Sequence, residues 1–295
     1  AKLLKALLKQ VPECKFFAVG DDWQSVYRFA GADIDLFTNF SSHFGVTATN
    51  QLTATFRSNT GISNVASRFI QKNPKQLKKS IVAQDKDEKA VVILRRYPSA
   101  ARQDEQCLAV LSEIAENKEV GRRKKSSVFL LARYWHQCPA QFEQWRDRFK
   151  EAFHLSFKTV HSSKGLEADY VVIMGLASGR FSFPSTIADD PLLELAMPMP
   201  ENFEHAEERR LFYVAMTRAQ NSLHLVSPLK YYVTQQPRHG DAHVYGARSR
   251  FLTPAVADAF ERVGPTAIGS TGVETDADTT AAVVDVAARL RGFWD

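Results

Sequence analysis

Short apolar runs alternate with a helix-patterned segment between residues 91 and 131, and this alternation constrains the fold more than any other feature. Residues 91–94 and 127–131 have the composition of buried strands, and residues 101–117 between them have the spacing of an amphipathic helix. Strand, helix and strand in this order favour a parallel sheet flanked by helices. We therefore expect an α/β fold.

The same two patterns predict further elements along the chain. Apolar residues at helical spacing indicate helices, and short apolar runs followed by turn residues indicate strands. We expect helices over residues 1–10, 65–70, 139–153, 207–219 and 251–263, and strands over residues 15–19, 170–174 and 223–226.

Length and composition narrow the class of protein. With 295 residues, 44% of them hydrophobic, the chain can form one large or two ordinary packed domains. It contains no apolar run as long as a membrane span and no signal-peptide pattern, so we expect a soluble cytoplasmic protein without a membrane partner. The three cysteines are far apart and lack a C-x-x-C pair, which argues against a disulfide framework and a zinc site.

The segment 207–219 carries a cation on an otherwise apolar helix stripe. At helical spacing, Leu211, Val214 and Ala215 share one stripe, and Arg218 falls on the same stripe. An inward guanidinium needs an anionic partner such as a carboxylate or a phosphate. A cation at the end of a helix can equally bind the last carbonyl groups. The segment alone leaves both interpretations open.

The segment 20–32 is rich in aromatic residues. Trp23, Tyr27 and Phe29 lie within seven residues and are interleaved with Gln24 and Arg28. Such a set can stack on bases while the cation meets the nucleic-acid backbone. Composition alone favours a packed aromatic core.

Four segments, in this order, resemble the third to sixth motifs of superfamily 1 DNA helicases of the UvrD/Rep group. They are residues 20–32, 52–59, 157–167 and 207–219. In the second of them, Phe56 stands where the family usually has Tyr, and Thr55 replaces the common Asn. The resemblance covers residues 1–230 by organisation, and its specificity lies in the four motifs.

The resemblance implies a role for each motif residue at an ATP site. One group senses or reaches the γ-phosphate, and the other contacts the adenine and ribose or helps to couple this site to DNA. The first group is Gln24, Arg57 and Arg218, and the second is Phe56, Glu167 and Gly165.

The resemblance also implies contacts with single-stranded DNA. Two aromatic residues are expected near the bases, and the other side chains near the backbone or at the connection to the ATP site. The aromatic pair is Tyr27 and Phe29, and the others are Arg28, Thr159, His161 and Lys164.

Two elements of an ATPase are missing from the sequence. No glycine is followed by lysine, so there is no G-x-x-x-x-G-K-[ST] phosphate-binding loop. The Asp-Glu pairs at 87–88 and 104–105 do not follow apolar strands, unlike magnesium-binding carboxylates of the family's second motif. We therefore expect a C-terminal portion that needs the missing N-terminal half of the same protein. On its own it should be inactive, with the ligands of Mg²⁺ lying upstream and no metal ligand in this chain.

The domain organisation follows from this comparison. Residues 1–50 would end a first RecA-like domain, residues 51–230 would form a second RecA-like domain, and residues 231–295 would be an extension with a linker at 264–280 and a last helix at 281–294. The short distance from Arg57 to Thr159, together with Trp23 and Phe29, resembles the helicase IV branch.

The resemblance implies an ATP-dependent 3′ to 5′ DNA helicase and single-stranded DNA translocase, with ATP and Mg²⁺ as cofactors. Its substrates would be single-stranded DNA and duplex junctions, in the context of DNA repair. The net charge of +5 is compatible with such a polyanion. The basic run 68–79 could track a phosphate backbone or form a solvated surface. The alternative is a helicase-like module that binds nucleic acid or a protein partner without hydrolysing ATP.

Overall fold

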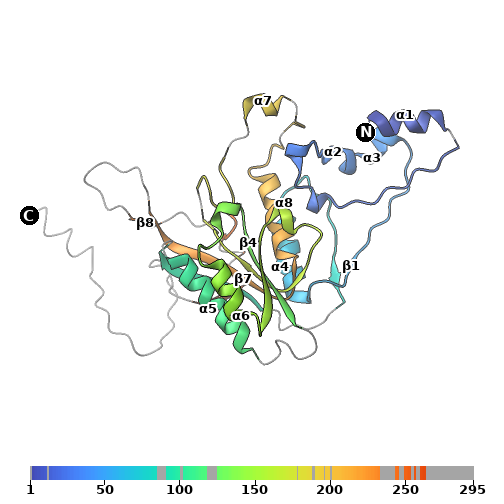
Figure 1. The fold of residues 1–295 in the computed structure, drawn as a ribbon. Helices are drawn as coiled ribbons and strands as arrows, with labels where there is room; N and C mark the ends of the chain where they lie inside the picture. Colours follow the sequence, from blue (N-terminus) through green and yellow to red (C-terminus); the bar gives the residue numbers. More distant parts are fainter. Residues whose placement is uncertain are drawn as a thin grey trace, which may run out of the picture. The chain divides into compact units, whose positions relative to one another are not determined.

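The computed structural model describes most of the first 263 residues (Figure 1). The expected linker at 264–280 and helix at 281–294 lie outside the described part of the chain. The described residues are 2–11, 13–84, 91–99, 102–117, 125–177, 179–187, 190–195, 197–199, 201–232, 243–245, 249–253, 256 and 260–263.

A parallel sheet forms the centre of the structure. Six strands follow the order β5-β4-β6-β7-β3-β9, each parallel to its neighbours, and β8 pairs antiparallel with β7. The α/β prediction is therefore confirmed. The strands are β3 (Val91–Ser99), β4 (Ser126–Ala132), β5 (Phe153–Thr159), β6 (Ala168–Ile173), β7 (Ala219–Tyr232), β8 (His243–Tyr245) and β9 (Glu261–Val263).

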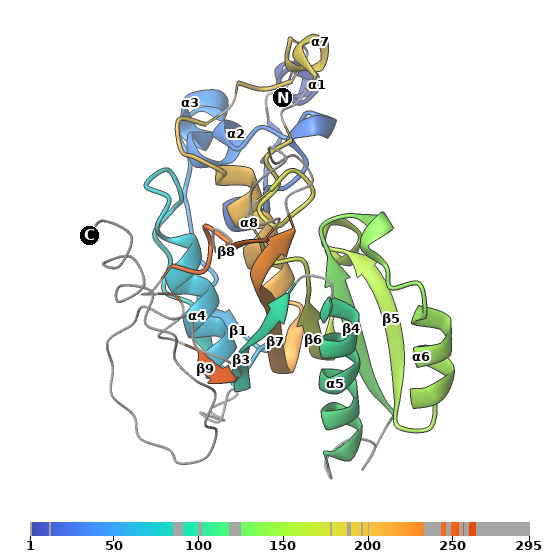
Figure 2. The same cartoon turned by 90° about the vertical axis from the view of Figure 1, so that its left-hand side faces the viewer.

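Helices cover both faces of this sheet, because successive side chains of a strand point to opposite faces. Along β6, Val171 and Ile173 belong to one apolar cluster, whereas Tyr170 and Val172 belong to the other. Figures 1 and 2 show the corresponding helix pairs on opposite sides of the strands. The first cluster includes α4 (Thr60–Ile70) and α8 (Ala206–Met216), and the second includes α5 (Gln103–Glu116) and α6 (Phe142–Phe149).

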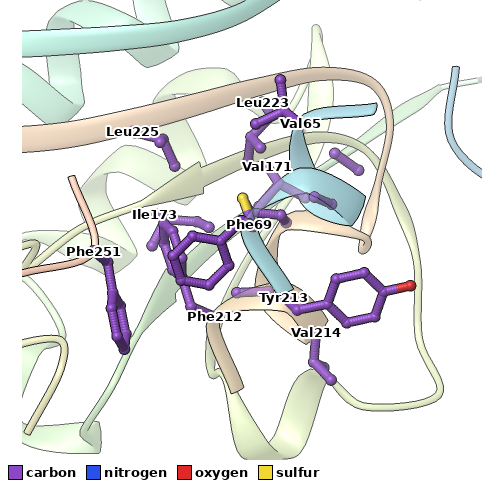
Figure 3. Close-up of a cluster of buried hydrophobic side chains, with 14 of the residues drawn as sticks. Val65, Phe69, Val171, Ile173, Phe212, Tyr213, Val214, Leu223, Leu225 and Phe251 are labelled. Carbon is purple, nitrogen blue, oxygen red and sulfur yellow. The ribbon is translucent and has the colours of Figure 1, made fainter. Parts of the chain in front are cut away.

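Aromatic rings fill the core beneath α4 and α8 (Figure 3). Phe212 is fully buried, and its ring centroid lies 5.1 Å from that of Phe69 and 5.5 Å from that of Phe251. Phe251 lies in a segment that follows β7, so the same contacts fix this late part of the chain to the two helices.

The start of α4 is tied directly to the start of β7. The Oδ1 atom of Asn59 accepts a hydrogen bond from the backbone N–H of Ile62, and its Nδ2 donates to the carbonyl of Asn221. Ser58 donates its hydroxyl to the carbonyl of Ala219. Asn59 is therefore the N-cap of α4, and the preceding β1 (Ala54–Thr55) pairs in parallel with β2 (Val82–Ala83).

The N-terminal part is less deeply packed. The predicted first helix is confirmed as α1 (Lys2–Gln10), which has no buried residue. The chain also forms α2 (Asp35–Thr38), α3 (Phe40–Phe44) and α7 (Pro191–Glu194), and single 3₁₀ turns at η1 (Asp22–Gln24), η2 (Arg28–Ala30), η4 (Trp135–Gln137) and η5 (His161–Ser163). None of the described helices is long and apolar enough to cross a membrane.

Two predicted elements are wrong. The strand predicted over residues 15–19 is absent, and these residues are exposed. A strand needs a neighbouring strand to bind its backbone N–H and C=O groups, and no described strand pairs with this segment. The helix predicted over 251–263 is wrong at Glu261–Val263, where β9 gains its hydrogen bonds from β3. In addition, α8 ends at Met216, so Arg218 lies beyond the helix.

Candidate nucleotide pocket and nucleic-acid surface

The loop between β5 and β6 runs from the carboxyl ends of the strands to their amino ends. Thr159 is level with Ala132 at the carboxyl end of β4, and Ile173 at the end of β6 is level with Leu131. Because all three strands are parallel, residues 160–167 must run back from the carboxyl end of β5 to the amino end of β6. The six residues of β6 make this distance about 20 Å at 3.3 Å per residue.

A polar cavity of ≈ 190 Å³ lies near the amino ends of β6 and β7. Gln24 and Arg57, which the sequence places in different motifs, both line it, as does Thr217 beside Arg218. Its wall also carries the side chains of Thr55, Ser58, Ser63 and Ser67. Hydroxyl, amide and guanidinium donors are the groups that bind phosphate oxygens.

Arg218 is buried beside this cavity and is held by three hydrogen bonds. Its Nε donates to the carbonyl of Val214 at 2.9 Å, its Nη1 to the carbonyl of Leu166 at 3.0 Å, and its Nη2 to the Thr217 hydroxyl at 3.2 Å. The contact with a helix carbonyl is thus present, and the phosphate contact stays a prediction. Burial and the nearby Arg57 cation lower the pKa of Arg218 to about 10, which indicates a site where an anion would be favourable.

Arg57 and Glu167 form an ion pair with each other. The Nε atom of Arg57 lies 2.9 Å from Oε2 of Glu167. The resemblance assigns the first residue to the γ-phosphate and the second to the ribose, so the structure brings two predicted ATP contacts together. Phe56, the predicted adenine partner, is 83% exposed and therefore presents its ring to solvent.

Gly165 lies in a tight turn that orients the Leu166 carbonyl and the Lys164 side chain. Leu166 N–H donates to the carbonyl of Ser163 at 3.0 Å, Lys164 has φ −60° and ψ 131°, and Gly165 has φ 87°. These angles define a type II turn, whose third residue requires a positive φ. The turn presents the Leu166 carbonyl to Arg218 and the Lys164 amine to the carbonyl of Gln24.

Lys164 contacts both the nucleotide pocket and the aromatic segment. Its Nζ donates to the carbonyl of Gln24 at 2.9 Å and lies 4.7 Å from the ring centroid of Tyr27. Burial, followed by the nearby Arg218 cation, outweighs the attraction of Asp21 and lowers the pKa of the Lys164 amine. The side chain is thus directed at the third motif.

Three rings gather at the other end of the loop. Tyr27, Phe29 and His161 have pairwise centroid distances of 5.7 to 6.0 Å. Phe29 is 62% exposed, whereas Trp23 is 1% exposed and belongs to the core. The core interpretation is confirmed for Trp23, and base stacking by Phe29 stays a prediction. Burial and the Arg133 cation lower the pKa of His161 to about 4, which keeps its ring neutral at physiological pH.

The two remaining predicted DNA contacts are held within the protein. The Thr159 hydroxyl donates to Oγ of Ser162 and accepts from the Ser162 N–H, which stabilises the turn at η5. The Nε atom of Arg28 donates to the carbonyl of Pro198 at 2.8 Å. Their roles in DNA binding stay predictions.

Helix α8 positions the third motif by residues that the sequence analysis did not single out. Glu207 accepts from the Arg28 N–H, and Arg210 donates from Nε to the carbonyl of Ser25. The ring of Tyr213 contacts Trp23 at 5.4 Å in an edge-to-face arrangement. These residues recur at intervals of three, which places them on one helix face, so their periodicity was a usable signal.

The described residues contain no group of three or more His, Cys, Asp or Glu side chains that could hold a metal ion. The cysteines are free, with Cys14 exposed and Cys107 buried.

Comparisons with known proteins identify the family of the chain. The family model described as the UvrD-like helicase C-terminal domain matches residues 140–229, and the UvrD/REP helicase N-terminal domain matches residues 1–45. The chain is 42% identical to DNA helicase IV of Escherichia coli over 222 residues, which is 75% of this chain and 31% of that protein.

Two further relatives carry similar descriptions. A probable DNA helicase of Mycoplasma pneumoniae is 27% identical over 77% of this chain and 40% of its own length. DNA helicase II of Escherichia coli is 31% identical over 42% of this chain and 14% of its own length. The chain therefore spans less than half the length of each of these relatives. Both family models, the ordered motifs and the RecA-like parallel sheet agree, and the chain belongs to the UvrD/Rep group of superfamily 1 DNA helicases.

Proposed function

We propose that this chain supplies the nucleotide-sensing and DNA-contacting part of an ATP-dependent 3′ to 5′ DNA helicase that translocates on single-stranded DNA. The observation that carries the proposal is the position of Lys164. Its amine contacts Gln24 of the polar cavity and the ring of Tyr27 in the aromatic cluster. Lys164 of the fifth motif thus contacts the third motif at two residues, one proposed for the nucleotide pocket and one proposed for DNA.

Gln24 and Arg57, which line the cavity, and Arg218, Phe56 and Glu167 outside its lining would together bind a nucleoside triphosphate. Arg57 and Arg218 would contact the γ-phosphate, and Gln24 would sense its presence. Phe56 would stack on the adenine, and Glu167 would contact the ribose. Cations fixed in a partly dry site stabilise the charge that develops on a phosphoryl group during its transfer. The phosphate-binding loop is not present in this sequence. We assign that loop and the ligands of Mg²⁺ to another segment of the complete natural protein, so this chain alone should not hydrolyse ATP.

The aromatic cluster would contact single-stranded DNA. Neutral rings with exposed faces stack on bases without sequence preference, and the contribution is about 1–3 kcal/mol per base. Phe29 is the most exposed of the three rings, and the neutral His161 lies beside it. Thr159, Arg28 and His161 would then meet the sugar-phosphate backbone. A duplex junction would place its single strand on this surface.

The proposal is tested by single-stranded-DNA-stimulated ATPase activity of the complete natural protein. We expect Arg218→Ala and Arg57→Ala each to lower kcat by about 10³-fold or more, as for other arginine fingers, while nucleotide binding is kept. The Arg57 side chain is 34% exposed, so its loss tests chemistry without removing a buried contact. The matched control is Arg146→Ala, which removes an exposed arginine paired with Glu143 on α6.

Two outcomes would contradict the proposal. An intact protein that binds DNA but lacks ATPase activity would favour the non-hydrolysing module, and so would activity that is indifferent to both arginines. Unwinding of substrates with a 5′ tail in place of a 3′ tail would contradict the polarity alone.

A further inference from the structure

Lys79 lies outside the four helicase motifs but is bound to two carboxylates of the third. Its Nζ lies 2.8 Å from Oδ1 of Asp21, forms an ion pair with Asp22, and lies 5.2 Å from the ring centroid of Trp23. The Lys79 side chain is 14% exposed and that of Asp22 is fully buried. A buried carboxylate needs a partner because water cannot stabilise its charge.

The backbone around Lys79 is fixed to the same segment. The indole Nε1 of Trp23 donates to the carbonyl of Leu77 at 2.9 Å, and the Leu77 N–H donates to Oδ2 of Asp22 at 2.8 Å. Hydrogen bonds in both directions therefore set the distance between the two segments. The adjacent Lys78 is exposed. Burial lowers the pKa of Lys79, but the two carboxylates outweigh it and the pKa is raised, so the amine is charged at neutral pH.

Asp21 in turn holds Gln24. Its Oδ2 accepts a hydrogen bond from Nε2 of Gln24 at 2.6 Å, and its Oδ1 accepts from the Trp23 N–H at 3.1 Å. An ionised carboxylate only accepts hydrogen bonds, so the amide NH₂ of Gln24 must face Asp21. The Oε1 atom of Gln24 is then the atom that remains for a ligand in the cavity that Gln24 shares with Arg57.

We propose that Lys79 is a positioning residue for Gln24, because its ion pairs with Asp21 and Asp22 fix the carboxylate that orients the Gln24 amide in the nucleotide pocket. Without the cation, the two adjacent carboxylates would repel each other. Asp21 would then turn toward water and release the amide. This inference rests on the proposed function of the pocket.

The first test compares lysine variants of the complete natural protein in the single-stranded-DNA-stimulated ATPase assay. We expect Lys79→Met to lower kcat by about ten- to a hundredfold, the effect of a misplaced catalytic group, with KM for ATP changed by less than about threefold. Lys79→Arg should restore much of kcat because it keeps the charge. Lys150→Met, at an exposed lysine outside the basic run 68–79, is the matched control, and its kcat should equal that of the unmodified protein.

A double-mutant cycle then separates positioning from a general structural role. If Lys79 acts through Gln24, Lys79→Met should change kcat by less than about twofold in a Gln24→Ala background. An equal loss in both backgrounds would overturn the inference, and so would unchanged activity of Lys79→Met. If Lys79→Met does not fold, Asp21→Asn goes through the same cycle, because Lys79 then keeps Asp22 as its partner.

The same variants distinguish failure of the proposed function of the pocket from failure of the proposed role of Lys79. Unchanged activity of Gln24→Ala and of Arg57→Ala would mean that the pocket has no role in hydrolysis, and the proposed function would fail. Strong losses in these variants combined with an additive effect of Lys79→Met would leave the proposed function intact and overturn only the role of Lys79.

Discussion

Gly165 holds a backbone conformation that residues with a side chain adopt only at an energetic cost. Its φ of 87° lies in the left-handed region, and the type II turn around it presents the Leu166 carbonyl to Arg218. A Cβ atom built on Gly165 would have no heavy atom within 4 Å. The requirement for glycine therefore comes from the backbone angle and not from lack of space.

This geometry makes a prediction at the scale of one residue. Gly165→Ala should lower the free energy of unfolding by about 1–2 kcal/mol, the cost of a left-handed conformation for a residue with a Cβ. Gly165→Asn should cost less, because asparagine tolerates this region. Both are measured by thermal unfolding of the complete natural protein. Equal losses for alanine and asparagine would mean that the turn does not hold this angle in solution.

Single-residue environments were the least predictable part of the site. Trp23 and Phe29 lie six positions apart in one aromatic segment, yet the first is buried and the second is exposed. The segment consists of 3₁₀ turns and loop, so it has no period from which an inward face could be predicted. The pairing of Lys79 with Asp21 joins residues far apart in the chain, and a basic run by itself indicates only a charged surface.

At the scale of elements, the sequence predicted best where the period was clear. The alternation that we used for residues 91–131 corresponds to β3, α5 and β4, although β3 runs on to Ser99 through two arginines. Arg95 is buried there because Glu113 of α5 pairs with it, and no local pattern shows such a partner. The strand prediction for residues 15–19 was wrong because no strand in the described part of the chain pairs with them, although their composition is apolar.

The junction of α4 with β7 yields a prediction at this scale. Asn59 is 4% exposed and uses its side-chain oxygen for the helix cap and its NH₂ for the carbonyl of Asn221. Asn59→Ala should therefore lower the free energy of unfolding by about 1.5–2.5 kcal/mol, of which about 1 is the cap and the rest the lost hydrogen bond to the carbonyl of Asn221, an exposed residue.

Serine provides the matched variant for this position. Asn59→Ser keeps a capping oxygen but cannot reach Asn221, so its cost should be smaller than that of alanine by about 1 kcal/mol. Hydrogen exchange of the amides in the first turn of α4 gives the same comparison locally. Identical exchange rates in the two variants would show that the cap does not stabilise this turn.

At the scale of the whole molecule, one loop connects the two proposed sites. Residues 160–167 run from the aromatic cluster at the carboxyl end of β5 to Glu167 at the amino end of β6. Lys164 lies between them and contacts Gln24 and Tyr27. Any movement of this loop on binding DNA would therefore be transmitted to the residues around the nucleotide, and the reverse must hold because coupling between two ligands is reciprocal.

Lys164→Met should remove this coupling while leaving each site in place. Coupling between ligands typically changes affinity 5- to 150-fold. In the complete natural protein, we expect the factor by which single-stranded DNA tightens binding of a non-hydrolysable ATP analogue to fall toward one. The same fall should appear when the analogue is bound first and DNA is titrated. Lys158→Met, which removes a lysine over the Phe129 ring on the neighbouring strands, should keep the factor unchanged.

The salt dependence of DNA binding decides between coupling and a direct backbone contact for Lys164. A lysine that neutralises a phosphate of single-stranded DNA contributes about 0.7 to the slope of log K against log salt concentration. Because the Lys164 amine is bonded to the Gln24 carbonyl, we expect Lys164→Met to keep this slope while the coupling factor falls. A slope reduced by about 0.7 with an unchanged coupling factor would instead make Lys164 a phosphate contact, and communication between the sites would then have to depend on the backbone of the loop and on the Arg218 contact at Leu166.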